Sequence, residues 1–378
     1  MNILFDARWI RTDAPSDGLS RYSSSLIHEL AKRDDINLTI LIYDKAQLGQ
    51  LPEVAYLMAN NPAQLYREFF IARLINPHHF DIVYSPSFFM GSYGRRYRLV
   101  LTIHDLIFFT YQTPPQWLAW DIRLKWRLFH SSLWPMRRFL NSADAVATVS
   151  QTARQELAER RMTRRPVSIV SNAVAHSFRD NSPADHASSR HVVYMGAFTP
   201  YKNAECLIQA IAQLPGMILD LCSKIPAKRR QQLEAFIAQC GVSDRVIIHD
   251  GVSDQQYRQL LRSARCLATA SRAEGFGLPI IEAQHAGVPV VCSDTPIFRE
   301  VGGEGALYFD PRSPAHAAAQ IERLADPELS RQMIRQGLQN TNRYSWAKSA
   351  EQVVAICHHV RGQQPHRQQT DAPLDGCR

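Results

Sequence analysis

The sequence has few features of a secreted, membrane-spanning or disulfide-bonded protein. Its apolar runs, such as LTILIY at 38–43, are much shorter than the roughly 20 residues that cross a bilayer. The first residues, MNILFDAR, have neither a basic segment nor a small-residue cleavage site, so we expect no signal peptide. The seven cysteines never form a C-x-x-C pair, which favours a reduced cytosolic protein.

Clustered metal ligands are also missing from the sequence. It has no Asp-x-Asp pair and no grouped His, Cys and carboxylate residues, so we expect no metal cofactor. The net charge of +8 favours an anionic partner, which could be a nucleic acid, an anionic lipid or a polyphosphate. No nucleic-acid-binding motif accompanies this charge, so we do not expect a nucleic-acid partner.

Strand and helix patterns alternate through two blocks, which predicts an α/β fold with two doubly wound parallel sheets. In the first block, the strand patterns are NILFDA, NLTILIY, DIVYSPS, LVLTIHD, AVATVS and PVSIVSN. In the second, they are HVVYMGA, MILDLCS, RVIIHDG, CLATA and PVVCSD. Ligands of doubly wound sheets bind outside the carboxyl ends of the strands, so we expect the site in a cleft between two such domains.

The predicted domain boundaries follow changes in composition. We expect a first domain at 1–178, a polar linker at 179–190 and a second domain at 191–343. An amphipathic helix at 344–361 follows, and the polar, Gln-rich tail at 362–378 is predicted to be disordered.

The stretch SRAEGFGLPIIEAQHAGVPVV, residues 271–291, is predicted to form a strand-to-helix turn. Pro279 suits the first turn of a helix, and Gly287 suits the position just after its end. Gly275 and Gly277 would let a ligand approach the backbone amides at the positive end of the helix, where phosphates bind. A carboxylate stands on either side of this turn, Glu274 and Glu282.

Two carboxylates beside a phosphate site are best explained as acceptors for hydroxyl groups. A nucleotide sugar has such hydroxyls on both sides of its diphosphate. The alternative is that Glu282 is a solvated helix residue and Glu274 an unremarkable loop charge, which would be preferred for either residue alone.

EGFGLPIIE resembles the E-x7-E pattern of the family 4 retaining glycosyltransferases. Five further blocks resemble that family's signature segments, in its order: LFDARWI…DGLSRYSSSLIHEL, LTIHDLIFF, ADAVATVSQTARQEL, VYMGAFTPYKNAECLIQAI and DGVSDQQYRQLLRSARCLATASRAEGFGLP. The likeness covers most of the chain. It implies the GT-B fold, in which two Rossmann-like domains face each other across a cleft.

The resemblance also implies roles for the residues of the turn. Glu274 is expected to contact hydroxyls of the donor sugar and Glu282 to contact the ribose. The turn amides would surround the donor sugar and diphosphate, and they belong to Gly275, Phe276, Gly277 and Leu278.

Lys202, in the segment TPYKN, matches the family's phosphate-binding lysine, which would offset charge on the leaving diphosphate. Many relatives carry an arginine near that lysine, and here the segment 196–202 has none. Arg272 is a candidate to replace its charge. The alternative for Lys202 is a solvated lysine before a helix.

Two residues of the first block match positions near the donor in this family. His104 ends the strand pattern LVLTIHD and is expected to orient or hydrogen-bond the sugar; a turn-capping role is the alternative. Gly18, in DGLSRY, would leave room for the donor phosphates or the acceptor, unless it is an ordinary turn glycine.

The expected reaction is transfer of a hexose, with mannose favoured, from a nucleoside diphosphate to a hydroxyl of a glycan or lipid-linked glycan. GDP-mannose is the favoured donor by resemblance, and the pathway would be assembly of cell-surface polysaccharide or lipopolysaccharide. The alternatives are another enzyme on this fold, such as a sugar-nucleotide epimerase or a phosphorylase, or a non-catalytic sugar-nucleotide-binding scaffold.

The region 117–165 combines four tryptophans with many arginines and lysines. This composition suits an interface with anionic lipid headgroups. The alternative is a helical region whose aromatic residues face the core. We therefore expect a cytoplasmic protein, with a peripheral position on the inner face of the cytoplasmic membrane as the further hypothesis.

Overall fold

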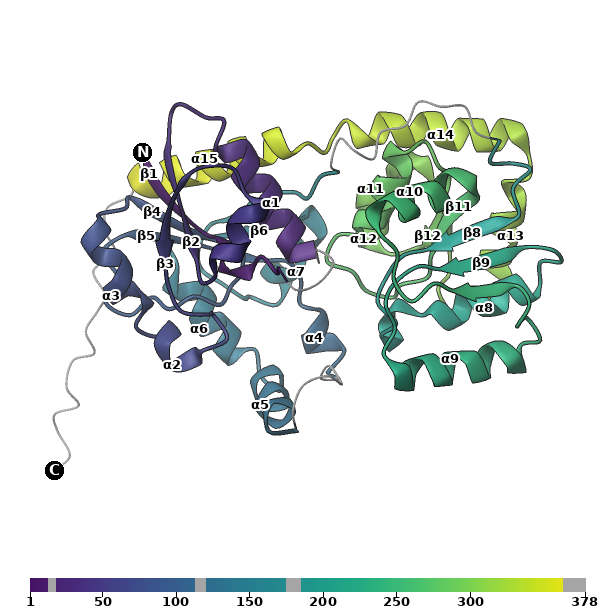
Figure 1. Cartoon of the computed structure of the whole chain (residues 1–378), viewed down its shortest axis with the longest axis horizontal. Helices are drawn as coiled ribbons and strands as arrows, with labels where there is room; N and C mark the ends of the chain where they lie inside the picture. The colour runs from purple at the N-terminus through teal and green to yellow at the C-terminus, as the bar shows by residue number, and fades with distance from the viewer. Residues whose placement is uncertain (13–17, 113–119, 175–184, 363–378) are drawn as a thin grey trace.

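The structure is a computed structural model that describes residues 1–12, 18–112, 120–174 and 185–362. Residues 179–184 of the predicted linker and residues 363–378 of the predicted tail lie outside the described residues. The chain forms two α/β domains side by side, joined at one edge by the last two helices (Figure 1).

The first domain contains a seven-stranded sheet in the order β3-β2-β1-β4-β5-β6-β7. All of its neighbouring strands are parallel. Its strands are β1 (Asn2–Asp6), β2 (Asn37–Ile42), β3 (Ala55–Met58), β4 (Ile82–Ser85), β5 (Arg98–Ile103), β6 (Ala145–Thr148) and β7 (Val167–Ile169). Its helices are α1 (Gly18–Leu30), α2 (Leu65–Glu68), α3 (Ile71–Ile75), α4 (Ile107–Thr110), α5 (Trp120–His130), α6 (Trp134–Ser142) and α7 (Gln151–Glu159).

The second domain contains a six-stranded parallel sheet in the order β10-β9-β8-β11-β12-β13. Its strands are β8 (His191–Tyr194), β9 (Ile218–Leu221), β10 (Val246–Ile248), β11 (Ala264–Thr269), β12 (Val290–Ser293) and β13 (Ala306–Phe309). Its helices are α8 (Ala204–Ala212), α9 (Ala227–Gln239), α10 (Asp254–Ser263), α11 (Leu278–His285), α12 (Pro296–Gly302), α13 (Pro314–Arg323) and α14 (Pro327–Thr341).

Helices cover both faces of each sheet, as the buried apolar strands require. In the second domain, α8, α9 and α13 share one core cluster, whereas α10, α11 and α12 pack on the opposite face. Each sheet reverses its strand order once, between β1 and β4 in the first and between β8 and β11 in the second. These reversals are where doubly wound domains bind ligands, and they place the site at the carboxyl ends of β1, β4, β8 and β11.

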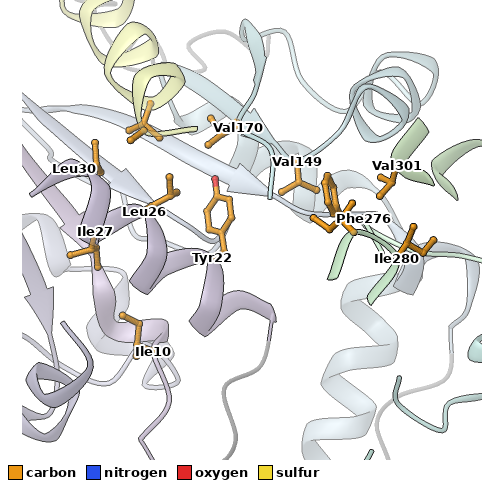
Figure 2. Close-up of a cluster of buried hydrophobic side chains, with 14 of the residues drawn as sticks. Ile10, Tyr22, Leu26, Ile27, Leu30, Val149, Val170, Phe276, Ile280 and Val301 are labelled. Carbon is orange, nitrogen blue, oxygen red and sulfur yellow. The ribbon is translucent and has the colours of Figure 1, made fainter. Parts of the chain in front are cut away.

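The largest apolar cluster includes residues of both domains. Figure 2 shows Val149 of the first domain close to Phe276 and Val301 of the second. The last helix, α15 (Trp346–Gly362), returns from the second domain and packs against α1 (Figure 1). The Ser349 hydroxyl on this helix donates to the carbonyl of Ser171 at 2.6 Å. Shared apolar packing and a returning helix therefore hold the two domains together.

Candidate functional site

The 271–277 turn connects β11 to α11 as the sequence predicts. Gly277 precedes the helix with φ at +99°, a conformation that favours glycine, and Pro279 occupies its first turn. A Cβ on Gly277 would lie 2.9 Å from the ring of Phe298, so the site has no room for a side chain. The backbone leads directly into the amino end of α11, where amides and the helix dipole favour an anion.

Lys202 and Glu274 meet beside this turn. Lys202 ends a short 3-10 helix, Pro200–Lys202, that follows β8. Its Nζ lies 2.6 Å from Oε1 of Glu274, and the Ser271 hydroxyl donates to the same oxygen at 2.9 Å. Burial opposes the charge on the ammonium, but the adjacent carboxylate outweighs it and raises the pKa of Lys202. Neither residue is therefore a freely solvated surface charge.

Glu282 is buried on α11, with 6% of its side chain exposed. Its Oε1 accepts a hydrogen bond from Nη1 of Arg21 at 2.8 Å, although Arg21 belongs to the first domain. Burial raises the pKa of Glu282 to about 7, an effect that Arg21 opposes and Asp254 increases. The alternative of a solvated helix residue is wrong for Glu282.

His104 and Asp105 follow β5 and face the turn from the first domain. His104 Nε2 lies 2.9 Å from the carbonyl oxygen of Pro86, so this nitrogen carries the proton and Nδ1 is an acceptor in the neutral ring. Asp105 accepts from the amide of Ile107 at 3.0 Å, and burial raises its pKa. A Cβ on Gly275 would lie 2.8 Å from Oδ2 of Asp105. The strand end of the first domain therefore abuts the turn of the second.

Two further predicted residues also lie at this junction. Gly18 begins α1, and a Cβ built on it would lie 4.0 Å from the side chain of Leu278 at the start of α11. Phe276 is 5% exposed, and its ring contacts that of Tyr344 edge-on with 5.5 Å between centroids. The side chain of Phe276 thus belongs to the core, which leaves only its backbone as a candidate ligand.

Arg272 is exposed, and its Nη2 donates to the Asn203 side chain at 3.3 Å. Its backbone amide donates to the carbonyl of Tyr201 at 2.8 Å, which fixes the turn to the Lys202 segment. The structure places Arg272 next to that segment, but its guanidinium is engaged with Asn203.

Several residues that bridge the domains were not predicted from the sequence. Arg21 contacts Asp254 at 2.9 Å as well as Glu282. The Tyr111 and Tyr201 rings from opposite domains lie 5.4 Å apart. The Glu300 carboxylate of α12 accepts from the amides of Gln151 and Thr152 at 2.7 Å each, at the start of α7. These pairs are far apart in the sequence, and no local pattern could have linked them.

The chemistry available to this site is polar and anion-binding. Within residues 1–12, 18–112, 120–174 and 185–362, no three His, Cys, Asp or Glu side chains are grouped to hold a metal ion. A lysine, a helix terminus and two glycines favour a phosphate, whereas three carboxylates and an imidazole can bind hydroxyls.

Two family models match this chain. The model described as Glycosyltransferase Family 4 matches residues 16–178, and that described as Glycosyl transferases group 1 matches residues 179–340. The O-antigen chain mannosyltransferase B of Escherichia coli is 29% identical over 391 residues, covering 94% of this chain and 98% of that protein. The GDP-mannose:cellobiosyl-diphosphopolyprenol alpha-mannosyltransferase of Komagataeibacter xylinus is 28% identical, with 49% of each chain covered.

Solved structures share the fold. Sucrose-phosphate synthase from Thermosynechococcus elongatus superposes with a TM-score of 0.74 at 19% identity, covering 95% of this chain and 98% of that one. Anabaena HepE in complex with UDP and glucose superposes with a TM-score of 0.73 at 18% identity, covering 95% and 100%. The two parallel-sheet domains thus form the GT-B fold, and the chain belongs to the family 4 glycosyltransferases.

Proposed function

We propose that this glycosyltransferase moves mannose from GDP-mannose to a hydroxyl of a glycan or lipid-linked glycan, with retention of the anomeric configuration. The observation that carries the proposal is the 2.6 Å contact between Lys202 and Glu274 beside the 271–277 turn. It brings a cation for phosphate and an acceptor for sugar hydroxyls to one anion-binding helix terminus. The mannosyltransferases of Escherichia coli and Komagataeibacter xylinus support the choice of sugar.

In this proposal the diphosphate lies against the amides of the 271–277 turn, and Lys202 stabilises the charge that develops on it as the sugar leaves. Glu274 accepts from hydroxyls of the sugar and Glu282 from those of the ribose. His104, whose Nε2 donates to the carbonyl of Pro86, lies beside the turn and helps to orient the sugar. The protein contributes position and charge, and the leaving phosphate oxygen takes the proton of the acceptor on the same face of the sugar.

We further propose that the reaction needs no metal, because Lys202 and the amino end of α11 supply the positive charge. Activity that persists after exhaustive treatment with a chelator would support this. Activity that is lost with the chelator and restored by a divalent cation would contradict it.

The donor is tested by thermal unfolding with GDP-mannose, UDP-glucose, GDP and UDP, since a bound ligand raises the unfolding temperature. GDP and GDP-mannose should stabilise the protein more than the uridine compounds. Release of GDP only when a glycan acceptor is present would identify a transferase, whereas sugar isomerisation without an acceptor would identify an epimerase. Donor binding with no turnover on any acceptor would favour the scaffold.

We also propose that the first domain contacts anionic lipid at the membrane surface. Trp120 of α5 and Trp134 of α6 are 79% and 69% exposed, and Leu124 and Leu128 are exposed between them, so these side chains do not face the core. Trp117 lies outside the described residues. Exposed aromatics among basic residues match the chemistry of an anionic bilayer surface.

A second group of exposed aromatic residues lies on the same domain, at Tyr66, Phe69 and Phe70 around α2 and α3. The guanidinium of Arg73 lies 4.6 Å from the ring centre of Phe70, which adds positive charge to this surface. Across the described chain, every helix is too short or too polar to traverse a bilayer. Contact with lipid would therefore be made by side chains at the surface.

Vesicle flotation tests the lipid proposal. The double substitution Trp120→Ser with Trp134→Ser should reduce recovery with vesicles that contain anionic phospholipid. Leu338→Ser, which changes an exposed apolar side chain of the second domain, should leave recovery unchanged. Equal recovery of the unsubstituted protein with neutral and anionic vesicles would contradict the electrostatic part of the proposal.

A further inference from the structure

Arg21 connects the first domain to the buried carboxylate of the second. It lies one turn into α1, and its Nη1 donates to Oε1 of Glu282 at 2.8 Å. Its Nη2 donates to Oδ1 of Asp254, at the start of α10, at 2.9 Å. One guanidinium thus binds two acidic side chains across the domain boundary.

Asp254 and Glu282 differ in how strongly Arg21 stabilises their charge, because they differ in exposure. Asp254 is 62% exposed, so water already stabilises its charge, and its ion pair with Arg21 contributes little. Glu282 is only 6% exposed, and a buried carboxylate without a cation is strongly disfavoured. The contact between Arg21 and Glu282 is therefore the one with consequences for the site.

The charged and titratable groups that influence Glu282 come from two elements. Arg21 on α1 favours the ionised form, and Asp254 on α10 disfavours it. Tyr257 on α10 is the other titratable neighbour, and burial raises its pKa well above its ordinary value, so it stays neutral at physiological pH. Burial raises the pKa of Glu282 to about 7 even with Arg21 in contact, so Arg21 keeps part of the carboxyl ionised near neutrality.

We propose that Arg21 is a positioning residue for the donor nucleotide: its cross-domain ion pair holds the Glu282 carboxylate as the acceptor for the ribose hydroxyls. This inference rests on the proposed function, which places the ribose at Glu282. It makes the first domain part of the nucleotide site without requiring Arg21 to touch the nucleotide. Donor binding then depends on the contact between the two domains, because the ion pair between Arg21 and Glu282 forms only when the domains are in contact.

The inference predicts a particular pH dependence. Ribose hydroxyls donate to an ionised carboxylate more strongly than to a protonated one. Removing Arg21 raises the pKa of Glu282, so more of the carboxyl is protonated at pH 7 and the nucleotide binds more weakly. A rise of one pKa unit corresponds to a loss of affinity of up to about tenfold, which is recovered as the pH is raised above the new pKa.

The experiment measures GDP binding by calorimetry from pH 6 to pH 9, using the full chain. A rise of one unit in the pKa of Glu282 means that Arg21→Ala should weaken binding at pH 7 by about fivefold and approach the unsubstituted protein at pH 9. Arg21→Lys should retain most of the affinity because it restores a cation. Lys32→Ala, which removes an exposed cation paired with Glu29 just after the same helix, should change nothing.

A double-mutant cycle with Glu282→Gln separates this role from a merely structural one. The amide cannot ionise, so Arg21→Ala should cause no further pH-dependent loss in that background. An unchanged pH profile in Arg21→Ala would overturn the inference, and so would a loss that is equal at every pH and not rescued by lysine. Should Arg21→Ala fail to fold, Arg21→Gln replaces it in both the pH series and the double-mutant cycle.

Failure of the proposed function gives a different result. If the unsubstituted protein binds neither GDP nor UDP, the nucleotide site itself is wrong, and the role of Arg21 falls with it. If it binds UDP better than GDP, the same series is run with UDP, and only the choice of donor is revised.

Discussion

The ammonium of Lys202 lies 2.6 Å from the carboxylate of Glu274, so the cation that we propose for the phosphate and the carboxylate that we propose for the sugar form an ion pair. The two side chains come from different strand ends, after β8 and after β11, which are neighbours in the second sheet. An incoming diphosphate sugar would offer each of them its own partner. The ion pair holds the two side chains, which are 17% and 13% exposed, beside the 271–277 turn, where we propose that the donor sugar lies.

Lys202→Ala should lower kcat by about 100- to 1,000-fold, the range typical of removing one charge-stabilising donor. The fold should persist, because Ser271 still donates to Glu274. Release of nucleoside diphosphate in the presence of acceptor measures the effect. Lys228→Ala, at an exposed lysine of α9, is the matched control and should keep full activity. Comparable rates in the two variants would show that Lys202 is not required for the reaction.

Glu282→Gln should remove an inflection near pH 7 from the pH dependence of donor affinity. The pKa of Glu282 is raised from its ordinary value to about 7, so the carboxyl is protonated below that pH and ionised above it. Affinity for GDP in the unsubstituted protein should therefore rise through pH 7, because the ionised form accepts ribose hydroxyls better. In the amide variant, a profile that still rises near pH 7 would assign the titration to another group.

The same ionisation should affect stability with the opposite sign. Since the folded pKa of Glu282 lies above its unfolded value, the folded state binds the proton more tightly. The contribution of this group to the free energy of unfolding should fall as the pH rises between about 4.5 and 7. Urea unfolding of Glu282→Gln against the unsubstituted protein at pH 5 and pH 8 measures it. A difference between the two proteins that is the same at both pH values would contradict the assignment.

Gly275→Ala should lower kcat/KM by about 10- to 100-fold, because small misplacements of a site have effects of this size. The added Cβ would lie 2.8 Å from Oδ2 of Asp105 and 3.3 Å from the backbone oxygen of His104, both in the other domain. The turn and the strand end would have to separate. Gly49→Ala, where a Cβ has nothing within 4 Å, is the control. Full activity in Gly275→Ala would show that this close approach is dispensable.

Glu300→Gln should lower the free energy of unfolding by about 1 kcal/mol, the typical effect of losing a capping carboxylate at a helix amino end. Its carboxylate accepts three hydrogen bonds from Gln151 and Thr152, of which the Thr152 hydroxyl contributes one at 2.6 Å. Chemical unfolding followed by circular dichroism measures the loss. Glu304→Gln, at an exposed position beyond the same helix, should have almost no effect. Equal stability of the two variants would mean that the contact between α12 and α7 is unimportant.

The fold class could be predicted because buried parallel strands are continuous apolar segments, such as LVLTIHD, separated by helical patterns. Two edge strands were not predicted. The strand β3 consists of the four apolar residues AYLM, and so short an apolar run without alternating polar residues does not distinguish a strand from a helix. In β13, the four residues ALYF are too short to distinguish from a loop or a helix end without their neighbour β12.

The local part of the site follows from the sequence alone, because glycine, proline and charge at fixed spacing constrain a single turn. The sequence placed Glu274 and Glu282 on either side of the 271–277 turn and Lys202 after a strand end. Which groups meet across the domains depends on how the folded domains pack. Arg21 lies 261 residues from Glu282, and their contact depends on how α1 and α11 face each other. That relation is set by apolar packing around Phe276 and by the return of α15, to which many distant residues contribute at once.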